Sequence, residues 1–132
     1  MSSFDVRTTA RVSFVDITSE VSQAVRASGM RDGACVVFVP HTTAGVTINE
    51  NADPTVRGDL EMALERLVPS DLPFRHLEGN SDAHVKASLM GSSVTIPVQH
   101  GDLLLGTWQG VYFAEFDGPR RRHCVVTTVP TG

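Results

Sequence analysis

The sequence is poor in cysteine and contains no long hydrophobic run. Its 132 residues include only Cys35 and Cys124. Each lies in an apolar, strand-like run, which predicts buried thiols rather than a disulfide framework or a zinc-binding set. No segment approaches the roughly 18 apolar residues of a membrane span, and the first residues contain no apolar stretch of signal-peptide length. We therefore expect a cytoplasmic protein that does not contact a membrane.

Positive charge is also scarce. Lys86 is the only lysine, the formal net charge is -4, and the one basic run covers residues 120–122. Binding to nucleic acid requires many lysine and arginine contacts with phosphates, so nucleic acid is not expected as a partner. Hydrophobic residues make up 41% and charged residues 20% of the chain, as in ordinary globular proteins. The length then predicts a single domain over residues 1–132.

Strand and helix patterns alternate through the first half of the chain. β-branched residues and continuous apolar runs predict strands, whereas apolar residues spaced by three or four predict helices. Small polar residues and an Asp-Pro pair mark the helix starts. The predicted strands cover 4–17, 34–39 and 42–48, and the predicted helices run from Thr18 or Ser19 to Gly29 and from Asp53 to just before Pro69.

The second half begins with a polar loop over residues 70–80 and a helix over 81–90. Val85 and Leu89 are expected to face the core from this helix. The remaining residues predict strands at 93–98, 103–106, 108–116 and 123–129. This order of elements predicts an α+β fold, with a mixed, largely antiparallel β-sheet and two or three helices packed on one side.

Three histidines lie where side chains can converge on a cleft. His41 stands between two predicted strands, His76 lies in the polar loop, and His84 is in the first turn of a helix, where the positive helix end favours a neutral ring. A catalytic metal site commonly uses three protein ligands and one open position. We therefore interpret the three histidines as ligands for zinc or magnesium, with His41 and His84 also as catalytic candidates. The alternative is that each is an ordinary loop or capping residue, since the spacing matches no HExxH-type motif.

Other polar residues are candidates for chemistry, each with a structural alternative. Asp53 and Glu115 are possible catalytic carboxylates, although an Asp before Pro is fully explained by helix capping. Trp108 lies in a glycine-flanked strand where a ligand can approach, but core packing is the more ordinary role of a single Trp. The arginines at 120–122 can clamp phosphate oxygens or form a solvated hairpin tip.

Longer segments resemble a known family. They are HTTAGVTINENADPTVRGDLE, RHLEGNSDAHVKASLMGSS and SVTIPVQHGDLLLGTWQGV, with EFDGPRRR downstream. Together they resemble the YjbQ-like family, also called the secondary thiamine-phosphate synthase family, over nearly the whole chain. The GTWQG segment is the most specific part of this resemblance.

The resemblance implies a compact α+β homotrimer that joins a hydroxymethylpyrimidine pyrophosphate to a thiazole phosphate. It marks that activity as secondary and leaves the main reaction open. The polar family motifs fall on the histidines and carboxylates already described, to which the resemblance adds further residues. The residues interpreted as binding a small phosphorylated metabolite are Asn49, Glu50, Asp82, Trp108 and Gln109, which the resemblance marks, and Arg121 from the basic run.

The implied reaction needs neutralisation of the leaving pyrophosphate by a metal or by basic side chains. Few basic residues are present, so a divalent ion would relieve the shortage. Two alternatives stay open. One is a metal-dependent hydrolase that uses a His-bound water, and the other is a non-catalytic, trimeric module that binds a metabolite or a metal.

Overall fold

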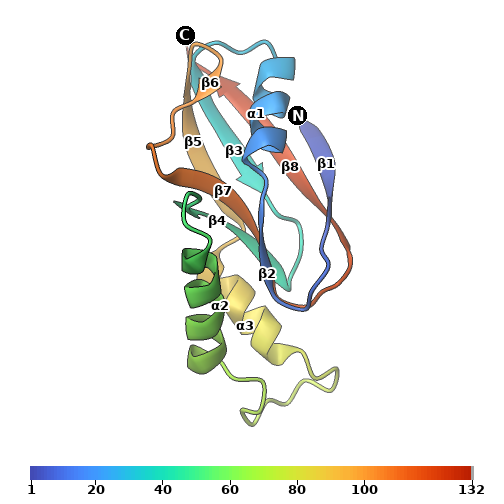
Figure 1. The fold of residues 1–132 in the computed structure, drawn as a ribbon. Coiled ribbons are helices and arrows are strands. Elements are labelled where there is room, and N and C mark those ends of the chain that lie inside the picture. Colours follow the sequence, from blue (N-terminus) through green and yellow to red (C-terminus); the bar gives the residue numbers. More distant parts are fainter. Residues whose placement is uncertain (132) are drawn as a thin grey trace.

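The computed structural model describes residues 1–131, which form two antiparallel sheets and three helices (Figure 1). The predicted α+β class is confirmed, and every strand pair in the described chain is antiparallel. The larger sheet has the order β1 (Ser2–Arg7), β8 (Arg121–Pro130), β3 (Gly33–Phe38), β5 (Ser93–Gln99) and β6 (Asp102–Leu103). The smaller sheet has the order β2 (Ser13–Asp16), β7 (Gln109–Glu115) and β4 (Ala44–Glu50).

The predicted strand over residues 4–17 is in fact two strands in different sheets. The chain leaves the larger sheet after Arg7 and enters the smaller one at Ser13. Thr8 is buried at this crossing, where its hydroxyl donates a hydrogen bond of 2.7 Å to Glu115. A tertiary contact thus interrupts an alternating pattern that would otherwise continue.

The main core lies between the larger sheet, the helix α1 (Thr18–Ala27) and one face of the smaller sheet. Val21 and Val25 of α1 are fully buried, as the apolar stripe predicts, and the helix ends before Gly29, whose φ is 75°. Cys35 and Cys124 are free thiols within this core, which confirms the prediction for both cysteines.

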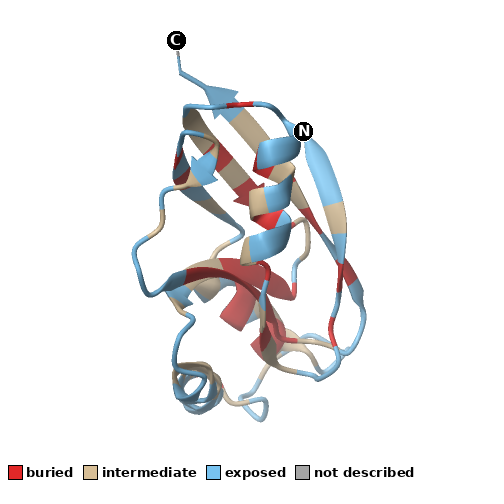
Figure 2. Ribbon diagram, turned by 45° about the horizontal axis from the view of Figure 1, so that its top comes forward, coloured by how far each residue is buried: buried red, intermediate tan, exposed pale blue. Residues whose placement is uncertain are grey.

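Strand β7 is buried on both faces (Figure 2). Val111 and Phe113 point into the main core, whereas Tyr112 and Ala114 belong to a second core on the opposite face. That second core is closed by α3 (Ser81–Met90) and, more loosely, by α2 (Thr55–Leu67). The smaller sheet is therefore the middle layer between the larger sheet and these two helices.

Helix α3 turns a different face to the core than the sequence suggests. Val85 and Leu89 are 39% and 63% exposed, so their predicted inward placement is wrong. The buried face carries Ala83, whose small side chain lets the helix approach the sheet, together with Asp82 and Lys86. Burying charges is tolerated when they are paired. Asp82 binds Arg11 and Lys86 at 3.1 Å each, and Lys86 reaches Glu65 of α2 at 2.8 Å.

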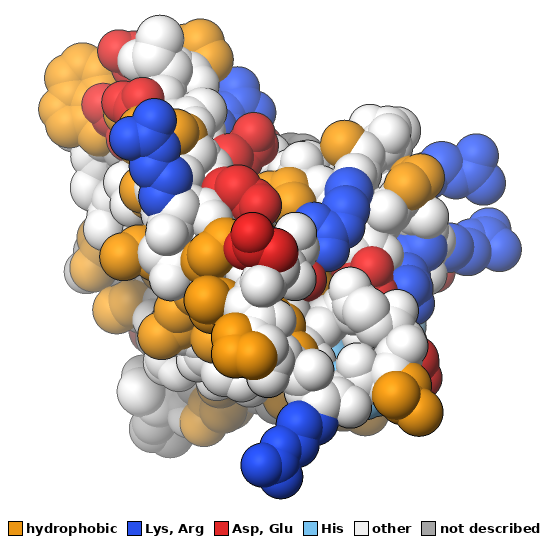
Figure 3. Space-filling view, turned by 90° about the horizontal axis from the view of Figure 1, so that it is seen from below, with side chains coloured by type: hydrophobic (Ala, Val, Ile, Leu, Met, Phe, Trp, Pro, Cys, Tyr) orange, Lys and Arg blue, Asp and Glu red, His pale blue; other side chains and the backbone are white. Residues whose placement is uncertain are grey.

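Helix α2 is the most weakly packed element. None of its residues is buried, and Leu60 and Leu64 contact the second core only in part. Figure 3 shows this end of the molecule, where charged side chains of both signs lie beside a group of apolar side chains. No helix within residues 1–131 is long and apolar enough to cross a membrane.

Candidate functional site

Three adjoining hollows surround the loop between β3 and β4. Two have volumes of about 510 Å³ and the third about 250 Å³. Thr42 lines all three, so we treat them as one groove, called the Thr42 groove. The groove is walled by the β3–β4 loop, β8, α3 and the segment that enters β5. Its polar lining includes His41, Thr42, His76, His84, Ser92 and Arg122.

The structure brings the three predicted histidines to this groove. His41 and His84 line the same 510 Å³ hollow, and His76 joins His84 in the smaller one. The rings of His76 and His84 meet edge to face, with their centroids 5.4 Å apart. The sequence placed these residues at element ends, and the fold gathers those ends around Thr42.

His41 is anchored through its Nε2 atom to strand β8. Nε2 lies 3.1 Å from the backbone nitrogen and 3.2 Å from the carbonyl oxygen of His123, so it accepts from the one or donates to the other according to its tautomer. Burial, followed by the nearby charges of Arg122 and His123, lowers the pKa of His41 below its ordinary value. The ring is therefore neutral at neutral pH, and Nδ1 is the nitrogen left for a ligand.

The three-histidine metal centre is not assembled within one chain. Among residues 1–131 no group of three His, Cys, Asp or Glu side chains is arranged to hold a metal ion. His41 is turned to β8, which leaves His76 and His84 as a pair, with Glu78 3.8 Å from His76 Nε2. A divalent ion at this pair would need water or ligand oxygens to complete its coordination.

Glu115 is fully buried behind the groove rather than exposed in it. Its carboxylate accepts hydrogen bonds from the Thr8 hydroxyl at 2.7 Å, from Arg122 Nε at 2.9 Å, and from the backbone N–H groups of Phe116 and Asp117 at 3.1 and 3.0 Å. Burial alone would raise the pKa of Glu115, but these hydrogen bonds outweigh it and lower the pKa. The predicted catalytic carboxylate is thus an ionised partner of Arg122.

Asp82, predicted to bind substrate, is likewise buried and bound to Arg11 and Lys86. The hydrogen bonds from these two cations outweigh the effect of burial and lower the pKa of Asp82. Its carboxylate joins α3 to the segment before β2. This contact gives Asp82 a role in the fold and none on the groove surface.

The two arginines that begin β8 point to opposite sides, because successive side chains of a strand alternate. Arg121, predicted to bind substrate, faces away from the groove, where it is 72% exposed and 3.4 Å from Asp5. Arg122 was not singled out, yet it is only 3% exposed and lines the groove. Arg122 and Cys124 are two residues apart on β8, so their side chains lie on the same face of the strand. The predicted burial of Cys124 is therefore the signal that could have identified Arg122.

The remaining predicted residues gather at the far end of the smaller sheet. Ala44 pairs with Glu115 near the groove, whereas Glu50 pairs with Gln109 at the other end of the two strands. Six residue steps along the strand separate these ends, which corresponds to roughly 20 Å. Within one chain, the structure therefore separates the following predicted residues from the groove: Asn49, Glu50, Asp53, Trp108 and Gln109.

Two of these residues have clear outcomes. The expected core packing of Trp108 is wrong, since 64% of the residue is exposed. The carboxylate of Asp53 binds the start of α2, where it accepts hydrogen bonds from the backbone N–H and the hydroxyl of Thr55 at 3.0 and 2.7 Å. The helix begins one residue later than predicted, at Thr55, with Pro54 in the N-cap position.

Comparison with known proteins covers nearly the whole chain. A family model described as UPF0047 protein YjbQ-like matches residues 2–131. A UPF0047 protein of Methanocaldococcus jannaschii is 53% identical over 126 residues, which are 96% of this chain and 91% of that protein. The UPF0047 protein YugU of Bacillus subtilis is 46% identical over 127 residues, 96% of each chain.

Solved structures show the same fold. A YjbQ/UPF0047-family protein of Clostridium acetobutylicum has a TM-score of 0.96 at 52% identity, with 98% of this chain and 100% of that chain covered. A YbjQ-like protein of Sulfolobus solfataricus has a TM-score of 0.94 at 32% identity, with 98% and 96% covered.

Proposed function

Because the chain belongs to the YjbQ-like UPF0047 family, we propose that it is an enzyme that binds a small phosphorylated metabolite in the Thr42 groove. The proposed reaction joins a hydroxymethylpyrimidine pyrophosphate to a thiazole phosphate, as a thiamine-phosphate synthase-type transferase. One observation carries the proposal: a single groove is lined by the imidazoles of His41 and His84 and by the guanidinium of Arg122. These groups are suited to donating hydrogen bonds to phosphate oxygens.

The groove residues fit the needs of this reaction. The thiazole nitrogen attacks the methylene carbon, a C–N bond forms, and the C–O bond breaks as its electron pair leaves with pyrophosphate. The attacking nitrogen carries a lone pair and no proton, so no ionised base is required, and the burial of Glu115 is no obstacle. The need is for donors around the leaving group. His41, His84, Thr42 and Ser92 supply them.

Net positive charge in the groove is small. Arg122 is paired with Glu115, and Arg120 donates to Asp117 at 3.1 Å. This shortage supports two further parts of the proposal. The synthase activity is modest and secondary to another reaction of a phosphorylated metabolite, and a divalent ion, zinc or magnesium, accompanies the pyrophosphate near His76 and His84 to neutralise its charge.

The direct test combines purified protein with both substrates, with and without divalent ions, and measures thiamine phosphate by chromatography. We expect product, and a fall of about 100-fold or more in turnover for His84→Ala, as for loss of a catalytic proton donor. His100→Ala is the matched control, since His100 lines a different hollow, beside Gly29 and Asp102. Absence of product under all ion conditions, or full activity of His84→Ala, contradicts the proposal.

A metal-dependent hydrolase is the second candidate, and the edge-to-face pair of His76 and His84 favours it. Elemental analysis of the purified protein separates the candidates. Stoichiometric zinc, together with hydrolysis of phosphorylated substrates, supports the hydrolase. Ligand binding without any turnover supports a non-catalytic metabolite-binding module.

Assembly and location complete the proposal. The family resemblance motivates a homotrimer, and the exposure of Trp108 and Leu104, at 64% and 56%, supports burial against other copies. Light scattering that reports a monomer contradicts this part. Free thiols and phosphorylated substrates both suit the cytoplasm.

A further inference from the structure

We propose that Arg122 binds an anionic oxygen of the ligand through its Nη1 atom, and that Glu115 is the residue that positions it. The inference rests on the proposed function, because it names the group that would hold a phosphate or pyrophosphate oxygen in the Thr42 groove. It also replaces Arg121, the arginine that the sequence favoured for this role.

The geometry leaves one side of the Arg122 guanidinium free. Nε donates to Glu115 at 2.9 Å, and Nη2 donates to the same carboxylate and to the Thr43 hydroxyl at 2.8 Å. Nη1 donates to no residue within the described range 1–131. The only fully covered side-chain atoms without a partner in that range are Ser13 Oγ and Asn80 Oδ1, so Nη1 keeps access to solvent.

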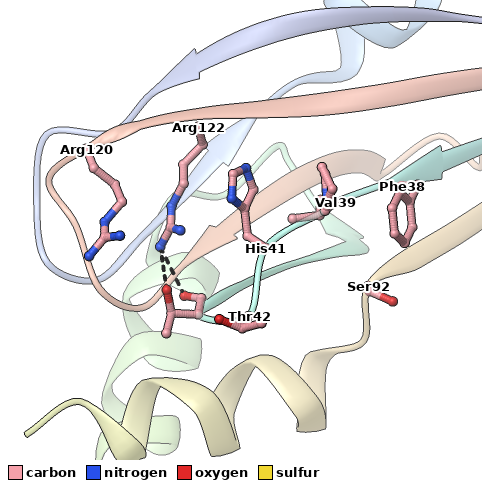
Figure 4. A pocket seen from close by; sticks show the side chains of 9 residues that line it. Phe38, Val39, His41, Thr42, Ser92, Arg120 and Arg122 are labelled. Atoms are coloured by element: carbon pink, nitrogen blue, oxygen red, sulfur yellow. Dashed lines mark hydrogen bonds between the residues drawn. The ribbon is translucent and has the colours of Figure 1, made fainter. Parts of the chain in front are cut away.

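The accessible side of the guanidinium faces the groove. Arg122 is 3% exposed, and it lines the hollow that His41, Thr42 and Ser92 also line. Figure 4 shows the terminal nitrogen that is not bound to Thr43 on the side of His41. A charged side chain that is otherwise enclosed thus presents its remaining donor to the same space as an imidazole and two hydroxyl groups.

A locked guanidinium is well suited to binding. A long side chain loses conformational entropy when it binds a ligand, which weakens binding. This loss is small where the side chain is already held in one conformation before the ligand binds. Glu115 fixes the plane of the guanidinium, and Thr43 fixes its end. Because Glu115 cancels the net charge, recognition depends on a directed hydrogen bond to an anionic oxygen more than on long-range attraction.

The test is titration of inorganic pyrophosphate into the full chain by calorimetry, with two neighbouring variants compared. Arg122→Lys keeps the charge and removes the planar fork, and we expect it to weaken binding by about 10-fold or more. Arg121→Gln removes a charge one residue away and should bind as the unaltered protein does. Equal weakening by the two variants, unchanged affinity in a folded Arg122→Lys protein, or no binding to the unaltered protein overturns the inference.

A second pair of variants separates the positioning of Arg122 by Glu115 from a general destabilisation of the fold. It also tests the inference if Arg122→Lys does not fold. Glu115→Asp keeps the charge but withdraws it by one methylene, so Arg122 is no longer held against Thr43. Asp82→Asn perturbs another buried, cation-bound carboxylate that lies outside the groove. We expect pyrophosphate affinity to fall several-fold in Glu115→Asp and to be unchanged in Asp82→Asn. Equal affinities in the two folded variants would refute a positioning role.

The same proteins keep this inference distinct from the proposed function. If the unaltered protein forms thiamine phosphate but Arg122→Lys binds pyrophosphate normally, the inference fails and the proposed function stands. If pyrophosphate binding depends on Arg122 but no product forms, the inference stands and the proposed reaction fails.

Discussion

Removing the charge of Glu115 should strongly destabilise the protein. In Glu115→Gln, either orientation of the amide turns its NH2 group toward donors. One orientation places it against the Thr8 hydroxyl and Arg122 Nε, and the other against two backbone N–H groups and Arg122 Nη2. Arg122 is then a buried charge without its counter-ion, since it is only 3% exposed. Breaking a buried ion pair in this way costs about 3–5 kcal/mol.

That cost is large beside the 5–15 kcal/mol that typically separates folded and unfolded states. A chain of 132 residues has an unfolding entropy near 0.28 kcal/mol/K at its midpoint, so the expected fall in Tm is about 11–18 °C. Calorimetry and urea unfolding at pH 7 measure both quantities. Arg121→Gln is the surface control and should change stability by less than about 0.5 kcal/mol.

A double variant tests the reason for the loss. Glu115→Met with Arg122→Met removes both charges, so no uncompensated ion remains, and it should be more stable than either single variant. The reasoning is refuted if Glu115→Gln unfolds within about 1 kcal/mol of the unaltered protein. It is also refuted if the losses of the two single Met variants simply add in the double variant.

The buried thiol of Cys124, the buried amine of Lys86 and the acid titration of the buried carboxylates give three further predictions. Cys124→Ala should lower the free energy of unfolding by about 1 kcal/mol and leave product formation intact. Burial raises the pKa of Cys124 to about 11. Thiol reagents should therefore label this residue only slowly in the native protein at pH 8. Lys86→Met removes the ion pair with Glu65 that joins α3 to α2, so limited proteolysis should cut the loop at 68–80 faster. An unchanged rate would mean that α2 is held by other contacts. Glu115 and Asp82 have lowered pKa values in the fold, so their ionisation stabilises it fully at pH values above their ordinary pKa values of 4.5 and 3.8. This contribution should disappear as the pH falls through and below those values. The free energy of unfolding of Glu115→Gln should therefore depend less on pH in the acid range than that of the unaltered protein.

Local sequence patterns predicted the elements whose signal lies within the segment itself. The continuous apolar run at 34–39 became β3, although the strand is buried on one face only, with Cys35 and Val37 in the core and Phe38 43% exposed. The stripe containing Val21 and Val25 became the buried face of α1. The break between β1 and β2 was not predictable in this way. It depends on Thr8 meeting Glu115, which lies 107 residues away in the sequence.

The same distinction applies to the candidate site. His41, His76 and His84 were predicted from their places at element ends, and the fold does bring those ends together. Arg121 and Arg122 are chemically identical in the sequence, and only the register of β8 against β1 and β3 decides which one faces inward. Trp108 is apolar by composition, but the fold of one chain provides no pocket that encloses it.

Strand β8 lies between β1 and β3 although it is the last strand in the sequence. During synthesis at about 5–20 residues per second, β1 therefore waits roughly ten seconds for the partner that pairs Phe4 with Cys124. The larger sheet lacks its connection between β1 and β3, and the Thr42 groove cannot form, until Arg122 has left the ribosome. Such dependence on non-local pairing slows folding, and it leaves the edge of β3 open to other chains in the meantime.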